Sequence, residues 1–435
     1  MTDDIFDQMS SAISGVALAR PVGRITQIAG GIVSIAGLSD AACVGDEVRV
    51  IGGTAGGEIV RTSGASIEAL IDGTTEGLGL GSNVVLLPRT KFAPHASWIG
   101  RVIDPHGKPL DGRPLLPGTR AQPVSAAPPP ASERRELGPR LSTGFAVFDT
   151  ILPIVRGQRI GLFAGSGVGK STLLSSLAKK VEADVIVIGL VGERGRELRE
   201  FVEKSLGPDG MARSIIVAAT SDRPAQVRRR CPQAATAVAE YFRDQGLHVL
   251  LLIDSVTRFA EAHREVAVAA GETANLRGHP ASTPAAIAGL CERAGPGTEN
   301  SGDITAIYTV LVAGSDMEEP VADMLRGVLD GHVVLDRNIA ERGRYPAIDV
   351  TRSVSRSLPE AANKAENALI QHARRLLGTY AQSELMIQAG LYSTGSDSKI
   401  DEAIAAHDAL DAFISAEGTH GVAGAFHLLQ KALQT

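Results

Sequence analysis

One glycine-rich segment, Ala-Gly-Ser-Gly-Val-Gly-Lys-Ser from Ala164 to Ser171, constrains this chain more than any other feature. An apolar run, Ile160 to Phe163, precedes it, and a helical pattern, Ser171 to Val181, follows it. The glycines let the backbone curl so that successive amides point at a polyphosphate, and the helix adds its positive end. The segment therefore predicts a nucleotide-binding loop, with a glycine-rich turn that binds no ligand as the alternative.

Two side chains at the end of this loop suit phosphate chemistry. Lys170 is placed to reach the β and γ phosphates, and the hydroxyl of Ser171 is placed to bind Mg²⁺. The usual pattern begins with Gly, whereas this one begins with Ala164, a mild departure because the glycines nearest the phosphates are kept. The residues expected to contact the nucleotide are Ala164, Gly165, Ser166, Gly167, Val168, Gly169, Lys170, Ser171 and Thr172.

Length and charge limit the remaining possibilities. A chain of 435 residues predicts two or three domains, and a net charge of −6 argues against nucleic acid as the default partner. Three widely spaced cysteines predict neither a disulfide framework nor a zinc cluster. The acidic N-terminus and the lack of a long apolar run predict a soluble, cytoplasmic protein.

The pattern along the chain predicts five parts. Residues 1–20 carry apolar side chains at helical spacing and predict a short amphipathic helix, and residues 21–92 contain short Val/Ile runs broken by glycines, typical of a small β-barrel or sandwich. A turn-rich and proline-rich connection spans residues 93–140. Apolar runs alternate with helical patterns over residues 141–356, and residues 357–435 are helical.

The alternation between residues 141 and 356 predicts an α/β fold with a parallel sheet covered by helices on both faces. Ligands bind such sheets at the carboxyl ends of the strands. The expected strands are Arg159–Phe163, Val185–Val191, Ser214–Ala219, Val249–Ile253, Ile304–Val312 and His332–Leu335. The expected C-terminal helices are Ala361–Tyr380, Glu384–Ala389, Ile400–Ile414 and Gly421–Leu433.

Carboxylates follow two of these strands. Asp254 ends an apolar run and is a candidate for the magnesium shell, with capping of the next helix as the alternative. Glu193 follows another strand and is a candidate for orienting the attacking water. A solvated turn is the alternative for Glu193, because Glu and Arg alternate in the segment Gly192–Glu197.

Five ordered motifs, of which the glycine-rich loop is one, carry a resemblance to a known family. The chain resembles the hexameric ATPases of type III export systems, most of all the flagellar export ATPase, a relative of the catalytic subunit of rotary ATP synthases. The similarity spans about Val22 to Ala416, and the initial Ala164 also fits the export branch. The other motifs that carry it are Gly192–Glu197, Leu252–Ala260, Asp323–His332 and Arg344–Asp349.

The resemblance implies a RecA-like nucleotide-binding core and a role for each site residue. Lys170 and Ser171 would bind phosphate and Mg²⁺, Glu193 would orient the water, and Asp254 would support the metal. Two further residues take their roles from the resemblance. Arg356 falls at the arginine finger that reaches the neighbouring subunit's nucleotide, with a surface arginine as the alternative.

The second residue placed by the alignment is Tyr345. It aligns with the aromatic side chain that packs on adenine, with a core ring as the alternative. In rotary synthases the catalytic Glu and the finger belong to different subunits, whereas this chain carries both, which predicts a homohexamer with ATP sites at every interface.

Partners also follow from the resemblance. They are a regulatory stator-like protein at the N-terminal helix, a central stalk protein, the export gate and chaperone-cargo complexes, with peripheral contact to the membrane. A helix that packs on its own barrel is the alternative for the N-terminus. The stretch Ala313–Pro320 and Asp336-Arg337 favour the flagellar branch over virulence secretion systems.

Two segments depart from simple expectations. His279 stands where the family has an aromatic residue, so it is either a titrating or stalk-contacting group or a loop histidine without a special role. Arg228 to Arg230 predict a solvated helix face rather than a nucleic-acid patch. An RNA or DNA translocase and a subunit that binds nucleotide without hydrolysis are the competing functions; charge disfavours the first, and Glu193 disfavours the second.

Overall fold

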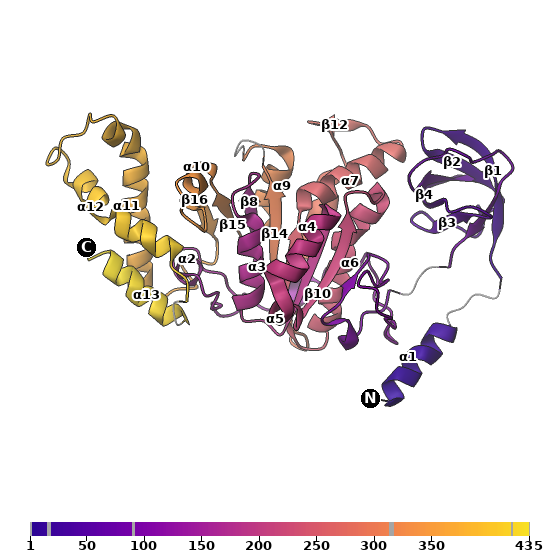
Figure 1. Ribbon diagram of the computed structural model, residues 1–435, viewed down its shortest axis with the longest axis horizontal. Coiled ribbons are helices and arrows are strands. Elements are labelled where there is room, and N and C mark those ends of the chain that lie inside the picture. Colours follow the sequence, from indigo (N-terminus) through magenta and orange to yellow (C-terminus); the bar gives the residue numbers. More distant parts are fainter. Residues whose placement is uncertain (1, 15–18, 89–91, 313–316, 419–420, 435) are drawn as a thin grey trace.

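The computed structural model describes residues 2–14, 19–88, 92–312, 317–418 and 421–434. Three bodies follow one another along the long axis in Figure 1: a β-barrel, a central sheet covered by helices, and a group of C-terminal helices. Helix α1 (Thr2–Ser14) lies below the barrel in that view. The predicted fold class, an α/β core between a small barrel and a helical domain, is confirmed.

The barrel is closed because its first strand pairs with both the second and the sixth, and side chains along its strands alternate between buried and exposed. Ile25, Ile35, Ile59 and Ile67 point inward and are at most 1% exposed. The hydrogen-bonded order is β1-β2-β5-β4-β3-β6, returning to β1. The strands are β1 (Val22–Ala29), β2 (Ile32–Ala36), β3 (Glu47–Val50), β4 (Gly56–Thr62), β5 (Ser66–Ile71) and β6 (Asn83–Leu86).

The central sheet has eight strands in the order β16-β15-β8-β14-β11-β9-β10-β7. Six strands were predicted, and all six are present within two residues of the expected bounds. They are β8 (Arg159–Ala164), β9 (Val185–Glu193), β10 (Ser214–Thr220), β11 (His248–Asp254), β14 (Asp303–Leu311) and β15 (Gly331–Leu335). They read as continuous apolar runs because parallel strands are buried on both faces.

The two edge strands were not predicted. β7 (Val102–Ile103) pairs with β10 and comes from the connecting segment, which therefore contributes to the core sheet. β16 (Ile348–Ser355) pairs antiparallel with β15. Its sequence mixes polar and apolar residues, as an edge strand can, so it lacks the apolar run of a buried strand.

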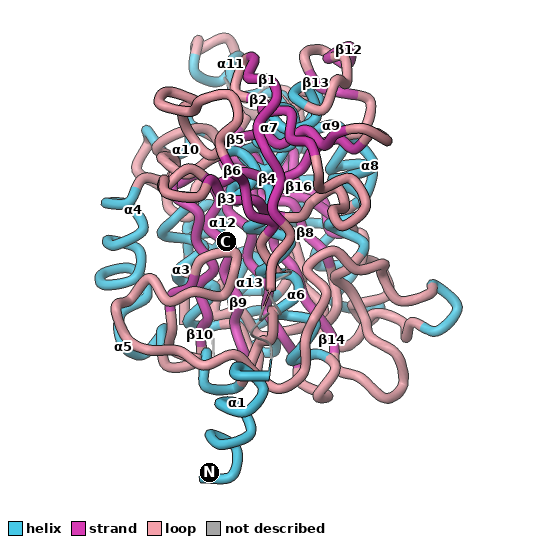
Figure 2. The backbone as a smooth tube through the Cα atoms, turned by 90° about the vertical axis from the view of Figure 1, so that its right-hand side faces the viewer, coloured by secondary structure: helices cyan, strands magenta, loops and turns pink. Residues whose placement is uncertain are grey.

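Helices cover both faces of the sheet, and alternate strand residues face opposite layers. On β9, Ile186 and Ile188 belong to the cluster under α3, while Val185 and Val187 belong to the cluster under α6 and α7. Figure 2 shows α4 and α5 on one side and α8 on the other. The helices are α2 (Ala146–Asp149), α3 (Lys170–Lys180), α4 (Gly195–Glu200), α5 (Gly207–Met211), α6 (Ala225–Arg243), α7 (Val256–Ala269), α8 (Thr283–Glu292), α9 (Pro320–Val328) and α10 (Arg337–Glu341).

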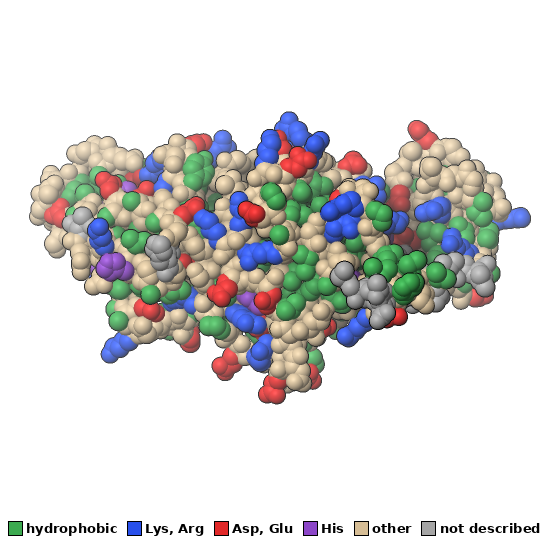
Figure 3. Space-filling view, turned by 60° about the horizontal axis from the view of Figure 1, so that its bottom comes forward, with side chains coloured by type: hydrophobic (Ala, Val, Ile, Leu, Met, Phe, Trp, Pro, Cys, Tyr) green, Lys and Arg blue, Asp and Glu red, His purple; other side chains and the backbone are tan. Residues whose placement is uncertain are grey.

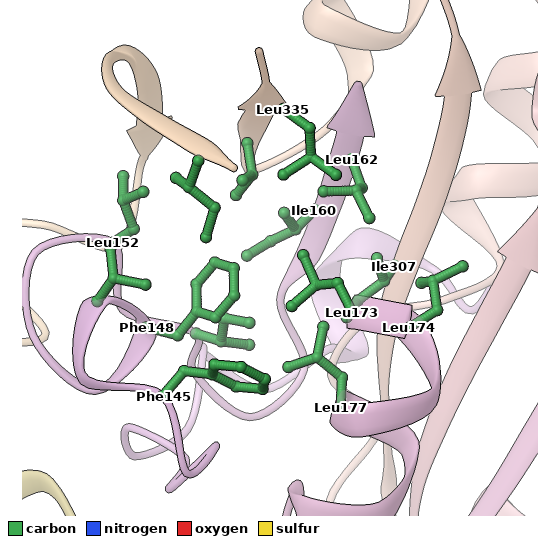
Figure 4. Packing of buried hydrophobic residues seen from close by; sticks show 14 of the residues in the cluster. Phe145, Phe148, Leu152, Ile160, Leu162, Leu173, Leu174, Leu177, Ile307 and Leu335 are labelled. Carbon is green, nitrogen blue, oxygen red and sulfur yellow. The ribbon is translucent and has the colours of Figure 1, made fainter. Parts of the chain in front are cut away.

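The C-terminal helices share a core with the sheet. They are α11 (Lys364–Gln388), α12 (Ser398–Ser415) and α13 (Gly421–Ala432). Leu376, Phe413 and Leu429 from these helices belong to the same buried cluster as Ile160 of β8. Figure 4 shows this cluster around Phe145 and Phe148. Two helices were expected where α11 runs unbroken; Ser383, in the expected gap, is a buried helical residue.

The barrel meets the core through a small apolar cluster and several polar contacts. Gln226 on α6 donates to the carbonyl oxygen of Leu70 at 3.1 Å and to Asp72 at 2.7 Å, and Arg229 pairs with Glu58. Arg230 donates to the carbonyl oxygen of Pro105 at 3.1 Å. The expectation of a solvated arginine face is therefore wrong for Arg229 and Arg230, because α6 packs there against the barrel and the connecting segment.

A short beta hairpin joins α7 to α8. It consists of β12 (Ala274–Leu276) and β13 (His279–Pro280). His279 is a buried residue of this hairpin, and burial lowers its pKa below the usual histidine range.

The remaining expectations concern the cysteines, a membrane-spanning helix and two short segments. All three cysteines are free, and Cys231 and Cys291 are buried. Within the described part of the chain, no helix has both the length and the apolarity that a membrane crossing requires. Residues 15–18 of the segment expected to form the N-terminal helix and residues 313–316 of the Ala313–Pro320 stretch lie outside the described residues.

Candidate nucleotide site

The glycine-rich loop turns from β8 into α3 as the sequence predicts. Gly167 and Gly169 have φ of +79° and +85°, in the left-handed region where a side chain would be strained. Gly165 has no such φ. Ala164 is fully buried at the end of β8, in the cluster under α3. Its methyl group packs in the core, which explains why Ala is tolerated at this position.

Lys170 begins α3 and forms an ion pair with Asp254, the last residue of β11. Both side chains are largely buried, with exposures of 11% and 5%. Asp254 Oδ1 also accepts a hydrogen bond of 2.7 Å from the hydroxyl of Thr309 on β14. The structure thus brings two predicted residues together and adds Thr309, which the sequence analysis missed.

Glu193 ends β9, beside β11 in the sheet. Burial raises the pKa of Glu193 to about 7, with further contributions from the negative charge of Asp254 and a hydrogen bond with Glu197. The neighbouring Arg194 pairs with Glu197 at 3.4 Å on the surface. Glu193 itself is half-buried, and the charges of Lys170 and Asp254 both act on its carboxyl group. Such a raised pKa is typical of groups that take part in proton chemistry.

The oxygen groups near Lys170 fit a hard cation. Mg²⁺ prefers oxygen ligands and keeps several waters. Ser171 offers an exposed hydroxyl, and within the described residues both hydrogen bonds of Asp254 fall on Oδ1, which leaves Oδ2 for a metal-bound water. The described residues contain no cluster of three or more His, Cys, Asp or Glu side chains that could bind a metal by itself.

A pocket of about 370 Å³ opens beside the loop. Tyr345 forms one wall: a methyl group placed on Gly169 would lie 3.1 Å from its ring, so the ring contacts the loop backbone. Tyr345 is 51% exposed, which excludes the alternative of a core ring. Other lining residues are Phe145, Gly167, Val168, Thr172, Leu173, Ser176, Leu335, Pro346, Ala347 and Glu417.

Arg356 lies at the other end of the sheet. Ser355 pairs with Gly331 at the start of β15, whereas Leu335, at the end of β15, pairs with Ala164 beside the loop. Four residues along a strand span roughly 13 Å. Arg356 is exposed and donates to the carbonyl oxygen of Arg326 at 3.0 Å. The structure therefore does not bring Arg356 to the loop of its own chain.

Comparisons with known proteins agree with this architecture. The ATP synthase alpha/beta family, nucleotide-binding domain, matches residues 144–355. The T3SS EscN ATPase C-terminal domain matches residues 362–420.

Curated relatives and solved structures extend the match. The chain is 45% identical to the flagellum-specific ATP synthase of Caulobacter vibrioides over 79% of each chain. It is 41% identical to the type 3 secretion system ATPase of Xanthomonas euvesicatoria over 93% of this chain and 91% of that one. The assembled ATPase EscN of enteropathogenic E. coli matches with a TM-score of 0.87 and 35% identity, over 94% of this chain and all of that one. The chain belongs to the family of type III export ATPases, which are related to the alpha and beta subunits of ATP synthase.

Proposed function

We propose that this chain forms a homohexameric ATP-hydrolysing motor of the flagellar type III protein export apparatus. One observation carries the shared-site part of the proposal: Arg356 and the phosphate loop lie at opposite ends of one sheet. A ring in which each chain offers Arg356 to the loop of the next uses both ends. The assembled form in which EscN was solved supports such a ring.

Each site residue has a role in this proposal. The loop amides and Lys170 bind the phosphates, and Ser171 and Asp254 hold Mg²⁺, which supplies charge neutralisation on the phosphates. Glu193 orients the attacking water as a carboxylate, and the neighbour's Arg356 stabilises charge on the transferred phosphoryl group. Asp254 pairs with Lys170 in the absence of nucleotide, and it would support the metal shell once bound phosphates pair with Lys170 instead.

The division of the chain follows the same proposal. Residues 21–92 form the barrel, 93–140 connect, 141–356 bind and hydrolyse nucleotide, and 357–435 form the helical domain. Residues 1–20 dock a stator-like partner: Phe6 and Ile13 on α1 are each 70% exposed, so this apolar surface is not packed on the barrel. Exposed apolar surface on an amphipathic helix suits a partner helix.

The other proposed partners rest on what is known of a relative and on the distribution of charged side chains over the surface. EscN was solved in complex with its central stalk EscO, which supports a central stalk for this chain. We also propose that this protein contacts the export gate and chaperone-cargo complexes. We propose that it is cytoplasmic and lies at the inner face of the export apparatus. Figure 3 shows acidic and basic side chains interspersed on one face, a distribution that does not favour nucleic acid.

The flagellar branch is favoured because two flagellum-specific ATP synthases are 45% and 48% identical to the chain, above the 41% of the type 3 secretion system ATPase. Deleting the gene in its source bacterium should abolish flagellar filaments, counted by electron microscopy. The unaltered gene should restore them, and Lys170→Ala should not. Normal filaments together with a loss of virulence-type secretion would overturn the flagellar assignment.

A further inference from the structure

A second exposed arginine, Arg326, stands beside Arg356. Arg326 belongs to the last turn of α9, and its backbone carbonyl accepts the hydrogen bond of 3.0 Å from the Arg356 side chain. Both residues are exposed. Their charges act on one further group: burial lowers the pKa of His332, and the positive charges of Arg326 and Arg356 lower it further. The two arginines therefore form a cationic patch at the end of the sheet away from the phosphate loop.

The backbone beneath this patch is fixed by hydrogen bonds. The amide of Arg356 donates to the carbonyl of Asp330 at 3.0 Å, and the amide of Asp330 donates to the carbonyl of Arg159 on β8 at 2.8 Å. Leu329 is 1% exposed, and its amide closes α9 by donating to the carbonyl of Leu325 at 3.0 Å. A helix end and the end of a paired strand thus present the two arginines together.

Neither arginine has an acidic partner within the described residues. Asp330 follows α9, but each of its carboxylate oxygens accepts from Arg159 at 3.0 Å. Asp323 stands at the i, i+3 spacing that suits an ion pair with Arg326, yet the structure forms no such pair. The negative end of α9 accounts for the hydrogen bond of Arg356, but it supplies no anion to the Arg326 side chain. Because the two like charges repel, an anion from another molecule would stabilise the patch.

In the proposed ring, this end of the chain meets the nucleotide bound by its neighbour. Nucleotide phosphates carry the negative charge that the patch lacks, and the planar guanidinium group matches the geometry of phosphate oxygens. We propose that Arg326 is a second arginine that each chain supplies to its neighbour, and that it binds the phosphate groups of the neighbour's nucleotide. This inference rests on the proposed shared site and adds a residue to it.

The two arginines have different roles in this inference. Arg356 contacts the transferred phosphoryl group, where charge develops during the reaction. Arg326 contacts phosphate groups whose charge stays the same from substrate to transition state. An interaction that is equally strong in both states lowers KM and leaves kcat unchanged. Loss of Arg326 should therefore weaken nucleotide binding, whereas loss of Arg356 should slow the reaction.

The first test measures kcat and KM for ATP in rings verified by mass. Arg326→Ala should raise KM about tenfold and leave kcat unchanged, because one partly exposed charged hydrogen bond to phosphate is lost. The affinity of the ring for a non-hydrolysable ATP analogue should fall by the same factor. Arg326→Lys should give an intermediate KM, because it keeps the charge and loses the planar fork. Arg375→Ala is the control: Arg375 is an exposed arginine on α11 that donates to His372 at 2.6 Å, and its loss should leave KM unchanged.

The second test asks which chain's Arg326 acts on a given nucleotide. In rings that mix Arg356→Ala and Lys170→Ala chains, an active interface takes its loop from the first chain and its arginines from the second. Arg326→Ala placed in the Lys170→Ala chain should raise the KM of the recovered hydrolysis about tenfold. The same substitution placed in the Arg356→Ala chain should leave that KM unchanged.

The outcomes separate this inference from the proposal on which it depends. An unchanged KM in Arg326→Ala, or the same KM for the two placements in mixed rings, would overturn a role for Arg326 at the neighbour's nucleotide. A fall in kcat without a change in KM would also contradict binding in the ground state. If mixed rings without any change at Arg326 recover no hydrolysis, the shared site itself is wrong.

Discussion

At the carboxyl ends of β8, β9 and β11, Lys170, Glu193 and Asp254 lie within one partly buried electrostatic cluster, whereas Arg356 at the opposite end of the sheet is exposed. The first group has its partners within the chain, including the Lys170–Asp254 pair. Within the described residues, the Arg356 side chain donates one hydrogen bond, to a backbone carbonyl. Under the proposed function, one chain therefore carries every catalytic group and still holds an incomplete site, because its Arg356 acts on a neighbouring chain.

We expect the largest loss of ATP hydrolysis from a substitution of the exposed Arg356. Arg356→Ala should lower the hydrolysis rate of the assembled protein by about 10³-fold or more, because an arginine finger supplies charge only in the transition state. ATP binding to the isolated chain should be unchanged, since Arg356 does not reach its own loop. Steady-state phosphate release and equilibrium binding measure the two effects. A binding loss equal to the rate loss would mean that Arg356 serves its own chain.

Glu193→Gln should lower hydrolysis by about 10² to 10⁴-fold, because the amide cannot polarise the attacking water. Nucleotide affinity should persist, as should assembly of the ring. A single-turnover assay with a binding titration tests this. Turnover close to that of the unaltered protein would remove Glu193 from the mechanism.

Thr309→Val should have a smaller effect, because it removes one hydrogen bond from Asp254 and keeps the side-chain shape. We expect the apparent affinity for Mg²⁺ to fall about tenfold or less, measured as the Mg²⁺ dependence of hydrolysis. Thr305→Val is the matched control: Thr305 bonds His248 and Gly157 at the other end of β14. That control should cost stability and leave the Mg²⁺ dependence unchanged. Equal Mg²⁺ effects in both variants would contradict a special role for Thr309.

The smallest expected effect is a shift in pH dependence. Because the raised pKa of Glu193 is about 7 and the carboxylate is the active form, kcat/KM should fall as pH drops through about 7. Glu197 raises that pKa through its hydrogen bond and charge, so Glu197→Gln should move this limb to lower pH. Arg194→Gln, a change in the same turn, tests general surface charge. A limb that stays in place in Glu197→Gln would assign it to another group.

The sequence predicted most of the central sheet because buried parallel strands are apolar throughout. It did not predict β7 and β16, which are short or mixed in polarity at the sheet edges. The loop and Asp254 were predictable because each follows directly from a strand. Thr309 and Glu417 were not, because strand register and helix packing, rather than any local pattern, bring them to the site.

The most direct test of a shared site mixes two inactive proteins, Arg356→Ala and Lys170→Ala, in rings shown by mass measurement to contain both. Each interface needs a loop from one chain and an arginine from the next. Equal mixing should therefore restore roughly a quarter of the interfaces and a corresponding share of ATP hydrolysis. Mixing Arg356→Ala with the double variant should restore nothing, because no intact arginine is present. Absence of recovery in rings that contain both single variants would contradict a site shared between neighbouring chains.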